Sequence, residues 1–483
     1  MTEYAELAVT TNFSFLHGAS HAEELVVTAK ALGLAAIGVA DRNTLAGVVR
    51  AHMAAREHGV GLLVGARLVP ADGPEILCYP RSRAAYGRLS RLLSQGKLAA
   101  PKGDCHLTLA DILAVSEDQV LIVLPPEPAA SGFAAQLEQV ALAAPGRTFL
   151  AARYAYSGRN RERIARLAEL GARCGAPIVA INDVLYHVPD RRPLQDVVTC
   201  IREHVTVDTA GFRLEANAER YLKPPEEMAR LFRGFEPALA RTLEIVRQCD
   251  FSLDELSYEY PDEPVPPGST PQAHLEVLAW QGAEWRYPQG IPVKVRAALE
   301  KELGLIADLK YAPYFLTVHD IVAWARGQDI LCQGRGSAAN SAVCFSLGVT
   351  KADAVRLGLL FERFLSPERD GPPDIDLDIE SGRREEVIQY VYDRYGRHYA
   401  AQVANVITYR SRSAVRDMAK ALGADPGQQD AWSKQLDPWK GVAGNLHDVG
   451  DHDIPTEVLQ LAAEVEHFPR HLGIHSGGMV ICD

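Results

Sequence analysis

The chain has 483 residues, of which 47% are hydrophobic and 23% charged, and its formal net charge is −12. This length predicts two or more domains that each bury a core. The negative charge argues against a protein whose whole surface grips nucleic acid, although a local basic groove stays possible. No apolar run is long enough to span a membrane and no basic signal-peptide start is present, so we expect a cytoplasmic protein without membrane association.

Residues 1–260 alternate between short apolar runs and helical patterns. The apolar runs include 35–39, 62–64, 120–124 and 178–181, and the helical patterns include 22–32 and 161–174. Such alternation predicts an α/β domain built on a parallel sheet.

A proline-rich segment, residues 261–268, follows this region. Its prolines suppress regular structure, so it is expected to be a linker. Beyond it, residues 270–287 and 292–310 have the pattern of amphipathic helices, the first opened by a Thr-Pro pair.

A Gly/Ser-rich stretch, Gln-Gly-Arg-Gly-Ser-Ala-Ala-Asn-Ser, occupies residues 333–341. It lies between an apolar run and a helical pattern at 338–347, which predicts strand, turn and helix. Glycines allow close backbone approach, and amides at a helix start suit phosphate oxygens. The stretch is not a Walker A loop. Taken alone it fits a tight turn, whereas together with the acidic segment below it predicts a phosphate cradle.

An acidic segment, Pro-Pro-Asp-Ile-Asp-Leu-Asp-Ile-Glu, follows at residues 372–380. On a strand, Asp374, Asp376 and Asp378 would share one face. Three neighbouring carboxylates repel one another unless a cation lies among them, and oxygen ligands favour Mg²⁺. An exposed acidic edge strand is the alternative interpretation.

Three arginines, Arg410, Arg412 and Arg416, lie among hydroxyl residues at a predicted helix start. This combination suits backbone phosphates of DNA, and a capped helix with exposed arginines explains it equally well. Residues 425–455 are polar and rich in Pro, Gly and Gln, which predicts an irregular loop.

The pairing of Gly-Arg-Gly-Ser at 334–337 with Pro-Asp-x-Asp-x-Asp at 373–378 resembles the palm of the C-family bacterial DNA polymerases, the polymerase III alpha subunits and their error-prone relatives. Residues 360–365, Leu-Phe-Glu-Arg-Phe-Leu, agree with that family. Segments 4–7, 12–16 and 191–197 are closer to its error-prone branch. The resemblance runs along essentially the whole chain and is confined to the N-terminal portion of the family.

This resemblance implies a multidomain α/β fold. Its expected parts are a PHP-type, barrel-like α/β domain at 1–260, the linker at 261–268, a polymerase-beta-like palm at 269–410, a helical thumb at 411–468 and the start of a second palm segment at 469–483. The metal motifs of the PHP domain are degraded: residues 6–11 hold no His-x-His pair, and Asp41 and Asp183 lack their usual histidine partners. A PHP metal site is therefore not expected.

The resemblance also implies a reaction, in which a primer 3′-hydroxyl attacks a deoxynucleoside triphosphate with the help of two Mg²⁺ ions. Asp374 and Asp376 would be the catalytic metal ligands, with Asp378 in a supporting role. The predicted triphosphate-binding residues are Arg335, Gly336, Ser337 and Arg363, and the predicted DNA-binding residues are Arg410, Arg412 and Arg416. The family's third catalytic aspartate follows the Gly-Gly segment at 477–478 and is missing here, so we expect weak or no primer extension by the isolated chain.

The implied partners are primer-template DNA and dNTP, with a sliding clamp and mutasome accessory proteins reached through further C-terminal regions. The implied roles are DNA replication, DNA repair and translesion synthesis after DNA damage. Two alternatives stay open: a PHP-type phosphoesterase with an inert palm, and a non-catalytic DNA-binding or assembly module that requires a partner chain.

Overall fold

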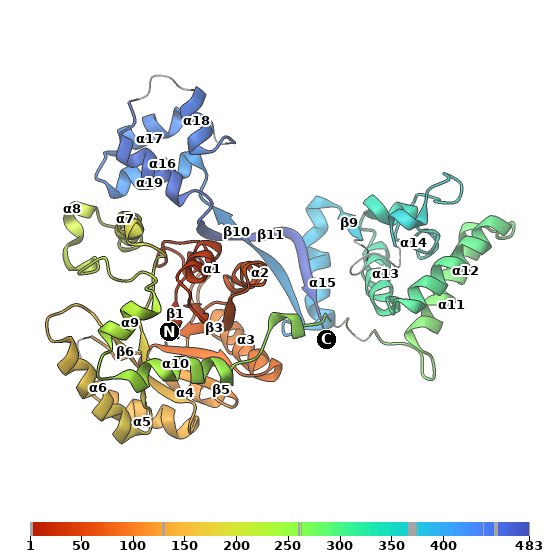
Figure 1. Ribbon diagram of the computed structural model, residues 1–483. Helices are drawn as coiled ribbons and strands as arrows, with labels where there is room; N and C mark the ends of the chain where they lie inside the picture. Colours follow the sequence, from red (N-terminus) through yellow and green to blue (C-terminus); the bar gives the residue numbers. More distant parts are fainter. Residues whose placement is uncertain are drawn as a thin grey trace. The chain divides into compact units, whose positions relative to one another are not determined.

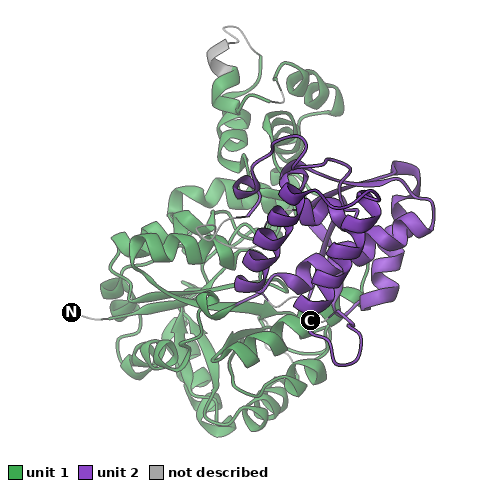
Figure 2. Ribbon diagram, turned by 90° about the vertical axis from the view of Figure 1, so that its right-hand side faces the viewer, with its two compact units in different colours: residues 1–256, 406–473 green, residues 257–405, 474–483 purple. Residues whose placement is uncertain are grey.

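The computed structural model describes residues 3–127, 131–258, 261, 263–365, 373, 375–437, 439–448 and 453–482. The chain forms two compact units, each built from two separate stretches (Figure 2). Unit 1 holds residues 1–256 and 406–473, and unit 2 holds residues 257–405 and 474–483. Among the described helices, none is both long enough and apolar enough to cross a membrane.

Unit 1 contains a seven-stranded sheet whose strands follow one another in chain order. They are β1 (Ala5–Val9), β2 (Ala36–Arg42), β3 (Gly61–Leu68), β4 (Ile76–Pro80), β5 (Gln119–Val123), β6 (Thr148–Arg153) and β7 (Ile178–Ile181). The prediction of a parallel sheet holds for the other strand pairs and is wrong at β4, which runs antiparallel to β3 and β5. Residues 69–75 are too few for a crossover and permit only an antiparallel return.

The sheet closes in a barrel-like manner. The chain just after β7 returns to β1 through a parallel bridge between Val184 and Val9. The Thr10 amide donates to the Val184 carbonyl at 2.9 Å, and the Val184 amide donates to the Ala8 carbonyl at 2.8 Å. This closure brings residues from both ends of the sheet together.

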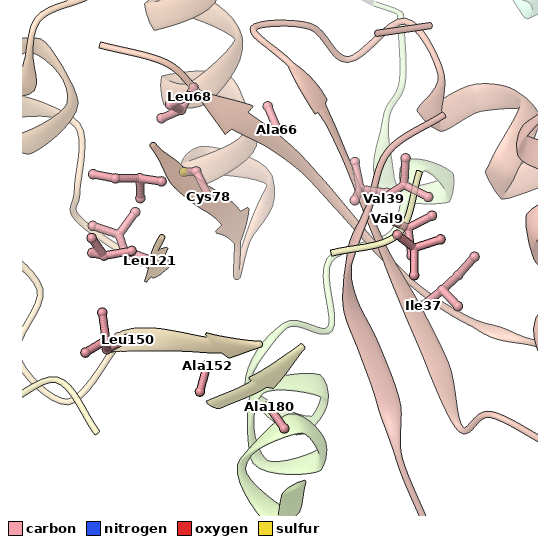
Figure 3. Packing of buried hydrophobic residues seen from close by; sticks show 14 of the residues in the cluster. Val9, Ile37, Val39, Ala66, Leu68, Cys78, Leu121, Leu150, Ala152 and Ala180 are labelled. Carbon is pink, nitrogen blue, oxygen red and sulfur yellow. The ribbon is translucent and has the colours of Figure 1, made fainter. Parts of the chain in front are cut away.

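Alternate strand residues enter two different cores. In β5 and β6, for example, Leu121 and Leu150 belong to one buried cluster and Ile122 and Phe149 to another. Figure 3 shows the first cluster, with side chains contributed by every strand of the sheet. Because both faces are covered, the strands read as nearly continuous apolar runs in the sequence.

Helices surround this sheet (Figure 1). They are α1 (Ala22–Ala31), α2 (Val48–His58), α3 (Arg83–Leu98), α4 (Leu109–Ala114), α5 (Phe133–Ala143), α6 (Asn160–Cys174), η1 (Pro189–Arg191), α7 (Arg192–Glu203), α8 (Val207–Ala210), η2 (Gly211–Arg213), α9 (Pro225–Leu231), α10 (Glu236–Gln248) and η3 (Leu253–Glu255).

A second group of helices completes unit 1: α16 (Ser411–Ala421), α17 (Pro426–Lys434), α18 (Val442–Asp448) and α19 (Thr456–Val465). They share a buried core with α7, to which Val198 and Met418 contribute. Arg191 pairs with Glu24 of α1 at 2.5 Å and lies 3.9 Å from Glu464 of α19. The prediction of an irregular loop at 425–455 is wrong for 426–434 and 442–448, where α17 and α18 lie and bury Trp432 and Val442 in the core shared with α16 and α19.

Unit 2 is mainly helical. Its elements are α11 (Pro271–Arg286), α12 (Val293–Asp308), α13 (Ala312–Gly327), β8 (Cys332–Arg335), η4 (Gly336–Asn340), α14 (Ala342–Ser346), η5 (Phe361–Arg363), β9 (Asp376–Ile379), η6 (Ser381–Arg383) and α15 (Arg384–Tyr395). The two helices predicted after the proline-rich segment are confirmed as α11 and α12. The Thr270 hydroxyl caps α11 by accepting from the Ala273 amide at 3.2 Å, the role typical of a threonine before a helix.

Two long strands, β10 (Ala400–Thr408) and β11 (Pro469–Ile481), pair with each other. The Tyr409 amide donates to the Phe468 carbonyl and the Cys482 amide to the Tyr399 carbonyl, so the pairing is antiparallel. Residues 474–481 of β11 thereby belong to unit 2, although they lie far from α13 and β9 in the sequence.

Candidate functional site

A cavity of about 570 Å³ in unit 2 is lined by several residues of the predicted site. Arg335, Asp376 and Asp378 line it, together with residues 475–479 of β11 and apolar side chains of α13 and α15. Cavities of this size accommodate small-molecule ligands. Two segments separated by about a hundred residues therefore meet at one concave surface.

The carboxylates belong to a two-stranded antiparallel sheet formed by β8 and β9. In its register Arg335 lies opposite Asp376, and Gln333 lies opposite Asp378. Asp376 and Asp378 are exposed, whereas the intervening Leu377 is half-buried against the core of unit 2. The predicted period-two alternation is confirmed for these residues. Asp374 lies outside the described residues.

Tyr314 of α13 holds the chain on both sides of position 374. Its hydroxyl donates to the Pro373 carbonyl at 2.8 Å and accepts from the Ile375 amide at 3.2 Å. Ile375 itself packs against the core of unit 2. The acidic strand is thus anchored to a helix at its entry, which limits where the following carboxylates can point.

Arg335 contributes a positive charge beside the acidic strand. Its Nε lies 2.9 Å from Oδ1 of Asp378, and both side chains are more than half exposed. Because water screens such a pair, it contributes little to stability, about 0–1 kcal/mol. Its effect is electrostatic, since it partly neutralises a cluster of carboxylates.

Two glycines shape the turn after β8. Gly334 approaches Val349 so closely that a Cβ would lie 3.0 Å from the Val349 carbonyl oxygen. Gly336 has a φ of 64°, in the left-handed region that glycine adopts without strain. A Cβ on Gly336 would also lie 3.7 Å from Oδ2 of Asp376, so this turn runs beside the carboxylate.

The predicted helix at 338–347 is wrong in extent, because a 3₁₀ turn (η4) precedes a short helix, α14. Buried Glu302 of α12 occupies the start of α14, accepting from the Ala342 amide at 2.9 Å, the Val343 amide at 3.0 Å and the Ser341 hydroxyl at 2.8 Å. Burial raises the pKa of Glu302 to about 7, although the two amides act to lower it. These two amides are therefore not available to a phosphate.

The remaining predicted triphosphate residues lie apart from the cavity wall. Ser337 lies in η4 and Arg363 lies exposed in η5, and neither belongs to the described residues that line the cavity. The cavity instead includes Arg384 and His475, which the sequence patterns did not single out. His475 Nδ1 accepts from the Gly478 amide at 2.5 Å, and Arg384 donates to the Ser476 carbonyl at 3.5 Å. The His-Ser-Gly-Gly run at residues 475–478 was the sequence signal that could have indicated His475.

The three predicted DNA-binding arginines are exposed in unit 1, with Arg410 just before α16 and Arg412 and Arg416 in its first half. Arg410 lies over the ring of Trp439, with 5.0 Å between its Cζ and the ring centre. Arg412 donates to the Leu436 carbonyl at 2.6 Å, and Arg416 donates to the Ser433 hydroxyl at 3.1 Å. Arg412 and Arg416 thus also tie α16 to α17 and its C-terminal end.

The two acidic residues left from the PHP motifs are both engaged by protein donors. Asp41 is buried and accepts from the Thr11 amide and hydroxyl, each at 2.8 Å, and from the Ser14 hydroxyl at 2.7 Å. Asp183 pairs with Arg67 and Arg220. These arginines hold the pKa of Asp183 far below its usual range despite its burial. Within the described ranges, no group of three or more His, Cys, Asp or Glu residues is arranged to hold a metal ion.

Comparison with known proteins connects these features to a family. The Bacterial DNA polymerase III alpha NTPase domain matches residues 273–483, and the PHP domain matches residues 6–144. The chain is 54% identical to the error-prone DNA polymerases of Caulobacter vibrioides and Rhodopseudomonas palustris (strain BisB5), over 99% of its own length and 45% and 44% of theirs. Along essentially its whole length the chain is similar to error-prone DNA polymerases.

This assignment confirms the resemblance predicted from the sequence, including its restriction to the N-terminal portion of the family. The error-prone DNA polymerase of Brucella abortus is 52% identical over the whole chain and 46% of its own length. The chain therefore spans slightly less than half the length of these C-family relatives. A solved amidohydrolase structure from Chromobacterium violaceum covers 38% of this chain and 88% of its own at 15% identity, with a TM-score of 0.29, too low to support an argument.

Proposed function

We propose that the chain contributes the palm and a DNA-holding region to an error-prone DNA polymerase that performs template-directed nucleotidyl transfer from dNTP to a primer 3′-hydroxyl. The observation that carries this proposal is the cavity of unit 2, where Asp376, Asp378 and Arg335 meet residues 475–479. The substrates would be primer-template DNA and dNTP. The cellular roles would be DNA replication and repair, including translesion synthesis after DNA damage, in the cytoplasm.

We further propose these domain limits: the PHP domain at 1–260, a linker at 261–268, the palm at 269–410, the thumb at 411–468 and a second palm segment from 469. Support for a two-part palm comes from unit 2, which combines 257–405 with 474–483. In the linker, Glu263 is buried and accepts from the Thr317 hydroxyl at 2.8 Å, which fastens this segment to α13.

Asp374 and Asp376 would hold Mg²⁺, with Asp378 in a supporting role. The donor set fits this ion, because Mg²⁺ is commonly bound by one or two carboxylates together with substrate phosphates. When bound, Mg²⁺ would lower the pKa of the primer hydroxyl and stabilise developing negative charge. No metal is proposed for the PHP domain, since Asp41 and Asp183 are already engaged by protein donors.

The chain's own residues would bind and orient the substrates. Once a cation binds Asp378, the present partner of Arg335, the Arg335 guanidinium would be free to pair with the triphosphate. The turn at Gly336 and Ser337 would contact the triphosphate through backbone amides and the Ser337 hydroxyl. Arg363 would add positive charge from η5. Arg410, Arg412 and Arg416 would contact DNA phosphates. A sliding clamp and mutasome proteins would bind other regions of the polymerase.

Primer extension by the purified chain tests this proposal. Because only two described carboxylates line the cavity, we expect little extension alone. A partner chain that carries the remaining polymerase regions should restore extension to the wild-type chain and not to Asp376→Asn. If the chain binds primed DNA in a salt-dependent way but no partner chain restores nucleotide incorporation, the result would favour the non-catalytic assembly module instead.

A further inference from the structure

Trp439 is an exposed aromatic residue in the connection between α17 and α18. Its exposed fraction is 81%, whereas Trp432, a few residues earlier in α17, is buried. Large aromatic side chains are usually covered at least in part by protein, and tryptophan is enriched at contact surfaces. Trp439 is therefore available to a ligand rather than to the core of unit 1.

The backbone that carries Trp439 is held firmly. The buried side chain of Asn445 donates to the carbonyls of Asp437 at 3.1 Å and Lys440 at 2.9 Å, and its Oδ1 accepts from the Asp437 amide at 2.6 Å. The Ser411 hydroxyl of α16 donates to the same Asp437 carbonyl at 2.8 Å. A side chain on such a fixed connection needs little further ordering when it binds a ligand.

Arg410 lies over one face of this ring. Its Cζ is 5.0 Å from the ring centre of Trp439, and its amide donates to the Ser413 hydroxyl at 2.9 Å, which fixes the backbone from which the side chain starts. A guanidinium group can stack on an aromatic face and still form hydrogen bonds in its own plane. Because 81% of Trp439 is exposed, this contact leaves most of the ring open to a second planar group.

Basic side chains flank Trp439. Lys440 follows it in the chain. Arg412 donates to the carbonyl of Leu436 at 2.6 Å, which places its guanidinium at the same connection. Such cations attract the phosphate backbone of nucleic acids, and bases of a single strand stack on aromatic side chains in basic surroundings of this kind.

Three carboxylates of this region are engaged by protein donors. Asp437 Oδ1 accepts from the Trp439 amide at 2.9 Å, and Glu466 accepts from the first amide of α18 at 3.0 Å. Asp430 pairs with Lys434 at 2.6 Å. These contacts partly neutralise the carboxylates, so they oppose an approaching phosphate less than free carboxylates would.

We propose that Trp439 is a stacking platform for an unpaired nucleobase of single-stranded DNA. This inference rests on the proposed contact between α16 and DNA, and it specifies the strand type that binds there. Bases inside a duplex stack on one another, whereas an unpaired base offers a free face to an aromatic ring. Because every base has such a face, the contact carries no sequence preference. The cations around Trp439 would hold the phosphates on either side of the stacked base.

Fluorescence anisotropy of a labelled oligo(dT) of about twelve nucleotides, titrated with the full chain in EDTA, tests this proposal. We expect Trp439→Ala and Trp439→Leu to weaken binding at least about fivefold, and Trp439→Phe, which keeps a flat ring, to weaken it less than about twofold. The matched control is Trp285→Ala. Trp285 is 68% exposed and its ring centre lies 4.7 Å from Cζ of Arg286, but it belongs to α11 in unit 2, so its loss should leave binding unchanged.

Intrinsic fluorescence gives an independent readout. The chain has five tryptophans, and a base stacked on Trp439 should quench part of their emission. The quenching by oligo(dT) should disappear in Trp439→Phe, which still binds, and should persist in Trp285→Ala. Quenching that persists in Trp439→Phe would contradict the stacking.

A blunt duplex of the same length separates stacking from a general DNA contact. Trp439→Ala should change the affinity for the duplex less than about twofold, whereas Arg416→Gln should weaken binding of both DNAs because it removes a phosphate contact. Full affinity of Trp439→Ala for oligo(dT), or an equal loss on both DNAs, would overturn the stacking proposal. Unchanged binding by Arg416→Gln would instead contradict the proposed phosphate contact of α16, so the two failures are distinguishable.

Discussion

Nε of Arg335 on β8 lies 2.9 Å from Oδ1 of Asp378 on β9, although the residue directly opposite Arg335 in the sheet is Asp376. The guanidinium therefore reaches diagonally across the two strands. This contact leaves one positive charge beside two exposed carboxylates. In our account it is a counter-ion that a bound cation and triphosphate would displace.

Replacing Arg335 by Gln should change the free energy of unfolding by less than about 1 kcal/mol, because the pair is exposed. The same change should increase Mn²⁺ affinity several-fold, since it removes a positive charge near the carboxylates. Lys301→Gln is the matched control, as Lys301 forms a similarly exposed pair with Glu362. A loss of several kcal/mol in denaturant unfolding would show that Arg335 has a structural role instead.

Replacing Arg410 or Arg416 by Gln should weaken binding of primer-template DNA and reduce its salt dependence. Loss of one phosphate contact lowers the slope of log K against log salt concentration by about one. Fluorescence anisotropy across a salt series measures this slope. Arg166→Gln, in a different part of unit 1, should leave it unchanged, and unaltered slopes for both variants would rule out a phosphate contact at α16.

Met418→Ala should destabilise unit 1 by about 2–5 kcal/mol, the usual cost of a large-to-small change in a core. Met418 of α16 is fully buried in the cluster shared with α7. Met53→Ala is the control, because Met53 is 63% exposed and its truncation should cost less than about 0.5 kcal/mol. Equal effects of the two variants in urea unfolding would contradict the shared core.

Glu302→Gln should destabilise the protein by about 1–3 kcal/mol, because the start of α14 loses an acceptor. The difference should also depend on pH. Burial raises the pKa of folded Glu302 from 4.5 to about 7, so the folded state binds more protons in this window and its stability falls as pH rises. The free energy of unfolding of the Gln variant lacks this decrease with pH. The difference in free energy of unfolding between the wild type and the variant should therefore become smaller as the pH rises from 4.5 to 7. A constant gap would contradict the raised pKa.

Local patterns in the sequence predicted much of the fold. The apolar runs of β2, β5 and β7 and the Thr-Pro start of α11 depend on neighbouring residues alone. The reversed direction of β4 depends on the length of one connection, which the apolar runs do not reveal. The helices α17 and α18 were missed because their polar composition hides the few residues that pack against α16.

The site was predicted only in part for a similar reason. The alternation around Asp376 is encoded locally, and the strand geometry follows from it. The contact between Glu302 and the start of α14 is not encoded locally, since Glu302 comes from a helix some forty residues earlier. The same holds for Arg384 and His475, which reach the cavity through the pairing of distant segments.

Mn²⁺ binding, followed by electron paramagnetic resonance of the free ion, tests the central claim most directly. We predict measurable binding by the wild-type chain, at least about tenfold weaker binding by Asp374→Asn and by Asp376→Asn, and a smaller loss with Asp378→Asn. Asp393→Asn, an exposed change on α15, should bind like the wild type. Equal Mn²⁺ affinity of wild type and Asp376→Asn would contradict the assignment of this strand as the metal-binding element.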